Sequence, residues 1–206
     1  MAETRFSVAE DVQIIARERR FQGYFAIDVY RVRHRTFAGG WTGDIVREVF
    51  ERGHAVVVIL YDPVRDQIAL IEQFRVGALA AGDYPWLVEC VAGIIEDGET
   101  PERVALREAE EEAGATAADM VHIGKYIITP GGSSETVQLF CARIDASRID
   151  GLHGLEHEGE DIRVFTVPVD EAYAMVKDGR IANSMAVIAV QWLMLERQGL
   201  KARWGV

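Results

Sequence analysis

The sequence predicts an α/β protein in which a mixed β-sheet lies between layers of helices, preceded by an N-terminal β-rich arm. Three observations predict it: strand-like apolar runs dominate the chain before residue 144, one well-delimited helix interrupts them, and two helices close the chain. With 206 residues, 49% of them hydrophobic, the chain is long enough to bury one sizeable core. We therefore expect an arm over residues 1–50 and one main domain over 51–206.

The strands are assigned from β-branched and aromatic runs bounded by turn residues. The arm is expected to hold strands within residues 12–37, with a turn near Gly23, and an alternating strand over 45–50. The main domain is expected to hold six more strand segments, at residues 54–61, 67–74, 86–91, 121–128, 136–143 and 162–167. The first two of these segments read as a hairpin, and the more apolar segments are expected to form the buried sheet.

The helices are assigned from their end signals. Thr100 is a good N-cap, a proline occupies the first helical position after it, and Gly114 ends the helix. Two more helices are expected near the C-terminus, one capped by Asp170 and one capped by Asn183 or Ser184. The last helix carries its apolar residues on one side, so it is expected to pack against the sheet.

Composition excludes several classes of function. The net charge of −11 argues against nucleic-acid binding, which needs a basic surface to release counterions from phosphates. Cys90 and Cys141 lie in apolar stretches, which favours two buried thiols in a reducing cytosol. The N-terminus lacks a secretory pattern, and the longest apolar run is too short to span a bilayer. We expect a cytoplasmic protein with neither nucleic-acid nor membrane partners.

The helix after Thr100 ends in clustered acids. Glu108, Glu111 and Glu112 share one face, whereas Glu110 points elsewhere. Glu108 and Glu112 form a like-charge pair that costs roughly 0.2–0.5 kcal/mol, and an anion in the last turn is disfavoured by about 0.3–1 kcal/mol. A solvated acidic face is the ordinary interpretation of such a run. Charges at the unfavourable end of a helix, with no local compensation, instead favour a functional site.

A divalent cation would turn this repulsion into attraction. Mg²⁺ prefers oxygen ligands and usually takes one or two carboxylates together with substrate phosphates. Glu108 and Glu112, one turn apart, could share such ions. The backbone carbonyl of Ala92, at the loop that Gly93 and Gly98 bracket, is well placed to add a ligand.

These residues belong to one longer motif. It reads Gly93, five residues, Glu99, seven residues, Arg107-Glu108, Ala109, one residue, Glu111-Glu112, one residue, Gly114 and Ala115. The motif resembles the Nudix box at every specified position, and the chain is identified as a member of the Nudix hydrolases. Pro130, sixteen residues after Gly114 and followed by a Gly/Ser-rich loop, is similar to the bacterial ADP-ribose pyrophosphatase subgroup.

The resemblance implies the Nudix fold, an α/β/α sandwich around a mixed sheet. It also implies that Glu108 and Glu112 bind Mg²⁺, with Mn²⁺ able to substitute and two or three ions at each site. Glu111 would be a third or water-mediated ligand, and Arg107 and Glu99 would orient the loop and the helix through ion pairs.

A Gly-flanked acidic loop over residues 150–161 suits closure over a site. By matching positions in the subgroup, Glu158 is the candidate base and Glu160 a further metal ligand. Glu135 is the rival base, and an exposed acidic turn is the alternative interpretation of the loop. His153 and His157 suggest zinc only weakly, because no cysteine or suitable third ligand lies nearby in the sequence.

Substrate contacts are expected from four residues. The guanidinium of Arg75, after an apolar strand, suits a substrate phosphate, with a surface charge as the alternative. By similarity, Arg47 would contact phosphate, Glu48 the adenine or ribose, and Tyr24 would stack on the adenine, although an aromatic residue in a strand is more often core. Related enzymes are homodimers whose arms reach the partner's site, and the β-rich arm is consistent with such an exchange.

The expected reaction is Mg²⁺-dependent hydrolysis of ADP-ribose to AMP and ribose-5-phosphate, with other nucleoside diphosphate sugars as possible substrates. GDP-mannose or NADH pyrophosphatase activity is the alternative within the same fold. A non-catalytic ligand sensor is a second class, but such proteins tend to lose the box acids, and this chain retains them.

Overall fold

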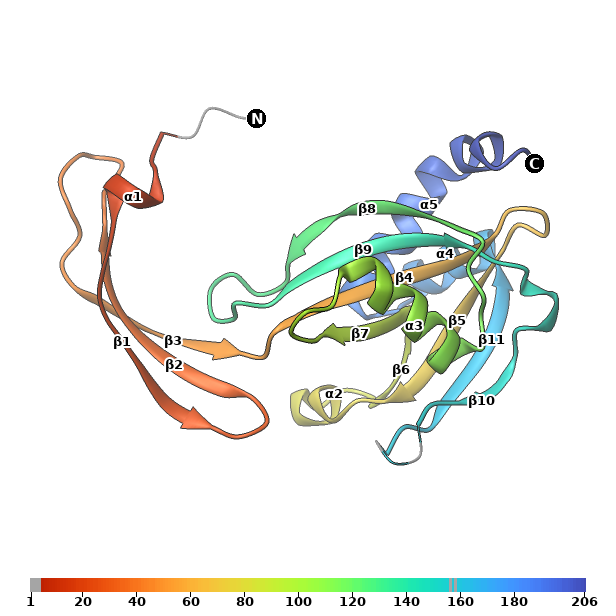
Figure 1. Cartoon of the computed structure of the whole chain (residues 1–206), viewed down its shortest axis with the longest axis horizontal. Coiled ribbons are helices and arrows are strands. Elements are labelled where there is room, and N and C mark those ends of the chain that lie inside the picture. Colours follow the sequence, from red (N-terminus) through yellow and green to blue (C-terminus); the bar gives the residue numbers. More distant parts are fainter. Residues whose placement is uncertain (1–4, 156, 158) are drawn as a thin grey trace. The chain divides into compact units, whose positions relative to one another are not determined.

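The computed structural model describes residues 5–155, 157 and 159–206 (Figure 1). The chain divides into two compact units. The first comprises Met1–His54 together with Ile127–Thr136, and the second comprises Ala55–Tyr126 and Val137–Val206. The first unit therefore includes a segment, residues 127–136, that the arm expected from the sequence does not contain.

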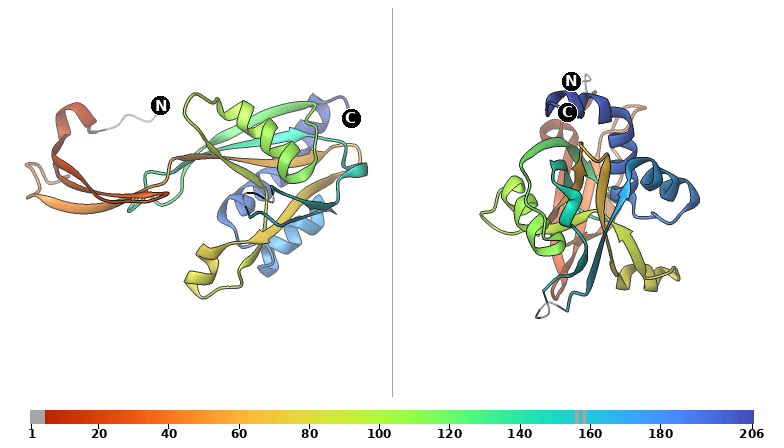
Figure 2. Two further views of the ribbon diagram at one scale, coloured as in Figure 1. Left: turned by 60° about the horizontal axis from the view of Figure 1, so that its bottom comes forward. Right: turned by 90° about the vertical axis from the view of Figure 1, so that its right-hand side faces the viewer.

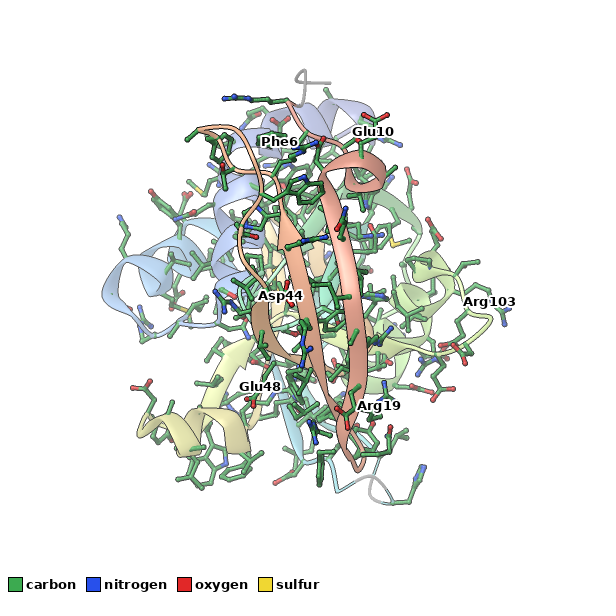
Figure 3. The ribbon with its side chains drawn as sticks, turned by 90° about the vertical axis from the view of Figure 1, so that its left-hand side faces the viewer. Phe6, Glu10, Arg19, Asp44, Glu48 and Arg103 are labelled. Atoms are coloured by element: carbon green, nitrogen blue, oxygen red, sulfur yellow. The ribbon has the colours of Figure 1, made fainter. Side chains whose placement is uncertain are left out.

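The first unit is built on a three-stranded antiparallel sheet with the order β1-β2-β3. A short helix precedes it, and the elements are α1 (Val8–Asp11), β1 (Val12–Gln22), β2 (Ala26–His34) and β3 (Ile45–Glu51). The register places Tyr30 opposite Arg47 and Val29 opposite Glu48. Figure 3 labels Glu48 on β3 and Arg19 on β1 of this sheet.

Few residues of this sheet are buried within the chain. All eleven residues of β1 are exposed, while Asp28 of β2 is 1% exposed and pairs with Arg17 and Arg19 at 2.6 and 2.7 Å. These two guanidinium groups hold the pKa of Asp28 down to about 2. A charged cluster, rather than an apolar core, therefore joins the first two strands.

The second unit contains an eight-stranded sheet with the order β10-β11-β5-β4-β9-β8, from which β6 pairs with β5 and β7 with β4. Its strands are β4 (His54–Asp62), β5 (Gln67–Phe74), β6 (Trp86–Glu89), β7 (Val91–Ile95), β8 (Asp119–Ile127), β9 (Thr136–Arg143), β10 (Gly151–His153) and β11 (Ile162–Pro168). β4 and β9 are parallel, whereas β4–β5, β5–β11 and β5–β6 are antiparallel. The prediction of a mixed sheet is confirmed.

Helices cover both faces of this sheet. They are α2 (Val76–Ala81), α3 (Pro101–Ala113), α4 (Val169–Asp178) and α5 (Ser184–Arg203), with a short 3₁₀ turn at Ala146–Arg148. In the right-hand view of Figure 2, α3 lies on one side of the sheet and α4 and α5 lie on the other. The predicted sandwich of helices around a sheet is therefore also confirmed.

The core between the sheet and α3 fixes the position of that helix. Val104, Ala105 and Ala109 of α3 are 0–1% exposed and pack in one cluster with β4 residues such as Val56 and Val58. Burial of these apolar side chains supplies the main driving force that holds α3 against the sheet. The acidic end of the helix is thereby held at a fixed place on the sheet.

Three local predictions need correction. The apolar run over residues 86–91 is two strands, β6 and β7, which pair with β5 and β4 respectively. Asp170 does not cap α4, because Pro168 occupies the N-cap position and no side chain caps that end. Helix α2 was not predicted, since VGALAA offers neither a capping side chain nor a helical apolar stripe.

Other local predictions hold. Asn183 caps α5, its Oδ1 accepting the N–H groups of Met185 and Ala186 at 3.0 and 3.1 Å. Cys90 and Cys141 are buried free thiols, and burial raises the pKa of Cys90 to about 12. None of the described helices combines the length and hydropathy needed to cross a membrane.

Candidate functional site

Helix α3 delivers the clustered acids to the sheet. Thr100 caps its start by accepting the N–H of Arg103 at 3.4 Å, and Gly114 ends it in the left-handed conformation at φ 58°. Within the last turns, Glu112 is 3% exposed, while Glu110 on another face is exposed. The predicted separation of Glu110 from the other acids is confirmed, and the acidic face points toward the protein rather than solvent.

Glu112 is held by the segment that precedes the helix. The backbone N–H of Ala92 donates to its Oε2 at 2.9 Å. Burial raises the pKa of Glu112 to about 8, and the charges of Glu108 and Glu160 add to this, whereas the N–H of Ala92 and the charge of Arg75 oppose it. Without a cation, this carboxyl is therefore expected to hold its proton near neutral pH.

Glu108 lies one turn earlier and packs against Gly93. A Cβ at position 93 would stand 2.0 Å from its Oε1, closer than any side chain can approach. Burial raises the pKa of Glu108 to about 7, and the charges of Glu111 and Glu160 contribute to the rise, while Arg107 opposes it. Only glycine at position 93 leaves room for the carboxylate where it lies.

Arg107 forms ion pairs with three carboxylates. Its Nη1 contacts Glu108 at 2.9 Å and Glu111 at 3.1 Å, and its Nη2 reaches Glu99 at 3.5 Å. The expected ion pair between Arg107 and Glu99 is therefore present. It ties the loop after β7 to the helix, because Glu99 also accepts the N–H of Glu96 at 3.1 Å.

Glu160 belongs to the loop between β10 and β11. Its charge contributes to the raised pKa of both Glu108 and Glu112, and its Oε2 accepts the N–H of Leu155 at 3.2 Å. The role of Glu160 as a metal ligand stays a prediction. The candidate base Glu158 lies outside the described residues.

Arg75 stands at the end of β5, where its Nε and Nη2 both contact Oε2 of Glu89 at 2.9 and 2.8 Å. Glu89 is 4% exposed, and Asn183 donates to its other oxygen at 2.7 Å. Neither Glu89 nor this contact of Asn183 was singled out from the sequence. The available signal was an acid inside the otherwise apolar run WLVEC, which marks a buried, paired charge.

The donor set fits a divalent cation. Glu108, Glu112 and Glu160 offer carboxylate oxygens, the ligands that Mg²⁺ prefers. A bound cation would offset both their mutual repulsion and the cost of burying their negative charges. Among the residues that the structure describes, no three His, Cys, Asp or Glu side chains already stand close enough to hold a metal. The carboxylates would therefore have to draw together around the ion.

His153 of the acidic loop packs against neighbouring backbone. His153 Nε2 lies 3.1 Å from the carbonyl oxygen of Asp150, and its ring lies against the Cα of Gly114. Within the described part of the chain there is no cluster that suits zinc. The interpretation of His153 as a loop-packing residue agrees with these contacts.

The remaining candidates belong to the first unit. Glu135 pairs with Arg52 at 3.4 Å and is 12% exposed. Arg47 and Glu48 are exposed on β3, where Nη1 of Arg47 donates to the carbonyl of Val46 at 2.8 Å. Tyr24 is 86% exposed and contacts Phe25 edge-on at 4.7 Å between ring centroids. Tyr24 is thus not a core aromatic residue.

The chain is similar to known proteins over most of its length. The NUDIX domain family matches residues 51–187. The chain is 48% identical over 194 residues to the "ADP-ribose pyrophosphatase" of Escherichia coli strain K12, covering 94% of this chain and 93% of that protein. It is 39% identical over 207 residues to the protein of the same name from Haemophilus influenzae, covering 99% and 95%.

Less similar relatives include proteins that are named for another substrate. The "GDP-mannose pyrophosphatase" of Enterobacter sp. strain 638 is 34% identical over 158 residues, covering 74% of this chain and 81% of that protein. Among solved structures, the "Crystal structure of ADP compounds hydrolase" superposes with a TM-score of 0.70 at 22% identity, covering 96% of this chain and 98% of that one. The structural match supports the fold.

Proposed function

Because this chain belongs to the NUDIX domain family, we propose that it hydrolyses the pyrophosphate bond of ADP-ribose and releases AMP and ribose-5-phosphate. The relatives named for this activity match nearly the whole chain at up to 48% identity. The relative named for GDP-mannose is less similar and covers a smaller share. Hydrolysis of GDP-mannose or NADH is the alternative.

One observation carries the proposal. Glu112 is buried, held by the N–H of Ala92 at 2.9 Å, and surrounded by the negative charges of Glu108 and Glu160. A fold that gains nothing from a buried acid cluster would be more stable with apolar residues there. The cluster is explained if its task is to bind cations that accompany a diphosphate.

The proposed cofactor is Mg²⁺, with Mn²⁺ able to substitute and two or three ions at each site. Glu108, Glu112, Glu160 and the carbonyl of Ala92 would hold it. When bound, such ions neutralise phosphate charge and lower the pKa of a coordinated water. Glu111, which is paired with Arg107 at 3.1 Å, would orient the helix end and take a water-mediated share of the site.

The remaining steps belong to the chain's own side chains. Arg75 would hold a phosphate oxygen through its guanidinium. Glu158 would accept the proton of the attacking water, and Glu135 is the competing candidate for that role. Glu135 is paired with Arg52 at 3.4 Å, so its carboxylate also has a structural partner.

We further propose a cytoplasmic homodimer in which the arm takes part in the partner's site. The support is the exposure of large apolar side chains in the first unit, including Ile14 at 63%, Phe21 at 60% and Tyr24 at 86%. A small sheet that exposes such residues needs a further surface to cover them. Arg47, Glu48 and Tyr24 would then contact the phosphate, the ribose or adenine, and the adenine ring of a substrate bound mainly by the partner.

Turnover of four substrates under one condition tests the substrate assignment. ADP-ribose, ADP-glucose, GDP-mannose and NADH are compared at equal Mg²⁺ concentration, with kcat/KM as the readout. We expect the highest value for ADP-ribose, with AMP as the nucleotide product. A higher kcat/KM for GDP-mannose or NADH would replace ADP-ribose as the proposed substrate. If none of the four were turned over, the proposed hydrolase activity would be refuted.

A further inference from the structure

The ion pair of Arg75 and Glu89 lies outside the proposed metal set. Both the Nε and the Nη2 of Arg75 contact the same oxygen, Oε2 of Glu89. The side chain of Glu89 is 6% exposed and that of Arg75 is 41% exposed. The carboxylate is therefore an internal anchor, and the guanidinium is the part that reaches solvent.

Asn183, the N-cap residue of α5, fixes the orientation of the Glu89 carboxylate. Its Nδ2 donates to Oε1 of Glu89 at 2.7 Å, while its Oδ1 accepts two backbone N–H groups at the start of α5. The amide cannot turn over without losing the helix cap. Asn183 thus always presents a donor to Glu89, and the orientation of the carboxylate follows.

The segment that carries Glu89 also serves the box. Glu89 lies three residues before Ala92, whose N–H holds Glu112. Glu89 in turn holds the guanidinium of Arg75 at 2.8 Å. One short stretch of backbone therefore sets the spacing between Arg75 and the acidic cluster.

The geometry leaves one edge of the guanidinium for a ligand. Glu89 engages the edge formed by Nε and Nη2. The edge formed by Nη1 and the second Nη2 hydrogen is not used in that pairing, and its two parallel donors match two phosphate oxygens. Arginine's fork can therefore serve an internal carboxylate and an external phosphate at once.

We propose that Glu89 is a positioning residue that, fixed by Asn183, holds Arg75 at the rim of the box carboxylates to receive a substrate diphosphate. The inference rests on the proposed function for the identity of the substrate. Glu89 lies outside the box motif and would act through Arg75. Without Glu89, the guanidinium of Arg75 would lose this fixed orientation, because its side chain is 41% exposed and free to take other rotamers.

Glutamine cannot replace Glu89 in this role. One end of a carboxamide is a donor, and the groups that contact the carboxylate of residue 89 are all donors: the guanidinium of Arg75, the Nδ2 of Asn183 and, at 3.5 Å, the Nε2 of Gln73. A Glu89→Gln side chain must turn its amide nitrogen toward one of them. The substitution keeps the shape of the side chain while breaking at least one of these contacts.

A double-mutant cycle tests the proposal with inorganic pyrophosphate. Calorimetry in Mg²⁺ measures its affinity for wild type, Arg75→Ala, Glu89→Gln and the double variant. We expect each single change to weaken binding about tenfold or more, and the double variant to bind no more weakly than Arg75→Ala. Independent, multiplying losses, or wild-type affinity in Glu89→Gln, would overturn the role.

Kinetics with ADP-ribose add a readout that a purely structural role would not give. We expect Glu89→Gln to raise KM by a larger factor than it lowers kcat. Pyrophosphate binding does not depend on which nucleotide is cleaved. A weakened pyrophosphate complex without any ADP-ribose turnover by wild type would thus refute the substrate while supporting the positioning role.

A matched control is the ion pair made by Glu72 on β5, the strand that precedes Arg75. Glu72 of β5 pairs with Arg163, and Glu72→Gln removes an ion pair of the same type outside the box. It should bind pyrophosphate as wild type does, and an equal loss there would overturn the proposal.

Asn183→Ser keeps a good helix cap but removes the donor to Glu89, and it carries the test if Glu89→Gln does not fold. We expect weakened pyrophosphate binding by a protein that stays folded, with a melting temperature lowered by the loss of one hydrogen bond. Wild-type affinity in Asn183→Ser would contradict the anchoring role. Wild type that takes up no pyrophosphate would overturn the assignment of Arg75 and the positioning role with it.

Discussion

The Cα of Gly93 lies directly against the carboxylate of Glu108, so that a Cβ at position 93 would stand 2.0 Å from Oε1 and 2.3 Å from Cδ. The glycine is required by this contact rather than by its backbone, because its φ does not lie in the left-handed region. The strand β7 and the helix α3 thereby approach each other through a glycine and a glutamate. The distance between these two elements sets where the acid can lie.

Gly93→Ala should displace the Glu108 side chain without unfolding the protein. The clash is with the end of a flexible side chain, which can turn away at modest cost. We expect a loss of activity of at least about tenfold and a weaker response to Mg²⁺, with a melting temperature close to that of wild type. Gly124→Ala is the control, because a Cβ there meets its neighbour at an ordinary 3.5 Å. Equal activity of the two variants would contradict the placement of Glu108.

Glu112→Gln should lower kcat by more than the roughly 10- to 100-fold that follows loss of a residue supporting a metal ligand. The amide keeps the shape of the side chain and can still accept the N–H of Ala92, so the fold should survive. Steady-state kinetics with ADP-ribose at several Mg²⁺ concentrations measure the effect. Glu110→Gln, on the exposed face of α3, should behave as wild type. Near-normal kcat in Glu112→Gln would remove this residue from the metal set.

The stability of the metal-free protein should fall as pH rises from about 4.5 to about 8. Between its ordinary pKa of 4.5 and its folded value of about 8, Glu112 holds a proton in the folded state that the unfolded chain has released. The free energy of unfolding therefore decreases with rising pH across this window. Urea midpoints in EDTA at pH 5.5 and 8 measure the slope, which Glu112→Gln should reduce. A wild-type slope that is unchanged in Glu112→Gln would show that this carboxyl does not hold its proton in the folded state.

Glu158→Gln should lower kcat more than it raises KM, because a general base acts in the chemical step. We expect a loss of about 10²- to 10⁴-fold, the usual contribution of such a base. Glu135→Gln is measured beside it, with the pair to Arg52 as its structural role. If Glu135→Gln is the more damaged of the two in kcat, the base is Glu135 and the assignment of Glu158 is wrong.

Much of the second unit could be predicted because its signals are local. Helix α3 begins and ends at the predicted residues, since a capping threonine, a proline in the first turn and a terminal glycine act within the helix itself. The strand over residues 67–74 also agrees with the structure at both ends. The unfavourable charge at the end of α3 is likewise a local anomaly, and it led to Glu108 and Glu112.

The features that could not be predicted depend on contacts between residues that are far apart in the sequence. Glu89 and Asn183 are 94 positions apart, so no spacing rule connects them. The break between β6 and β7 follows from which neighbouring strand each one pairs with, and an apolar run does not record this. Residues 127–136 join the first unit through backbone bonds between Phe50 and both Gly132 and Ser134, at 2.8 and 3.2 Å, which the loop composition did not indicate.

Uptake of divalent cations by the acidic end of α3 is the claim on which the proposed chemistry depends. Calorimetric titration of Mg²⁺, and of Mn²⁺ in a parallel experiment, into the metal-free protein tests it most directly, with and without a non-hydrolysable ADP-ribose analogue. The account predicts saturable binding that tightens with the analogue and weakens in Glu112→Gln. Absence of uptake of either ion under both conditions would contradict it.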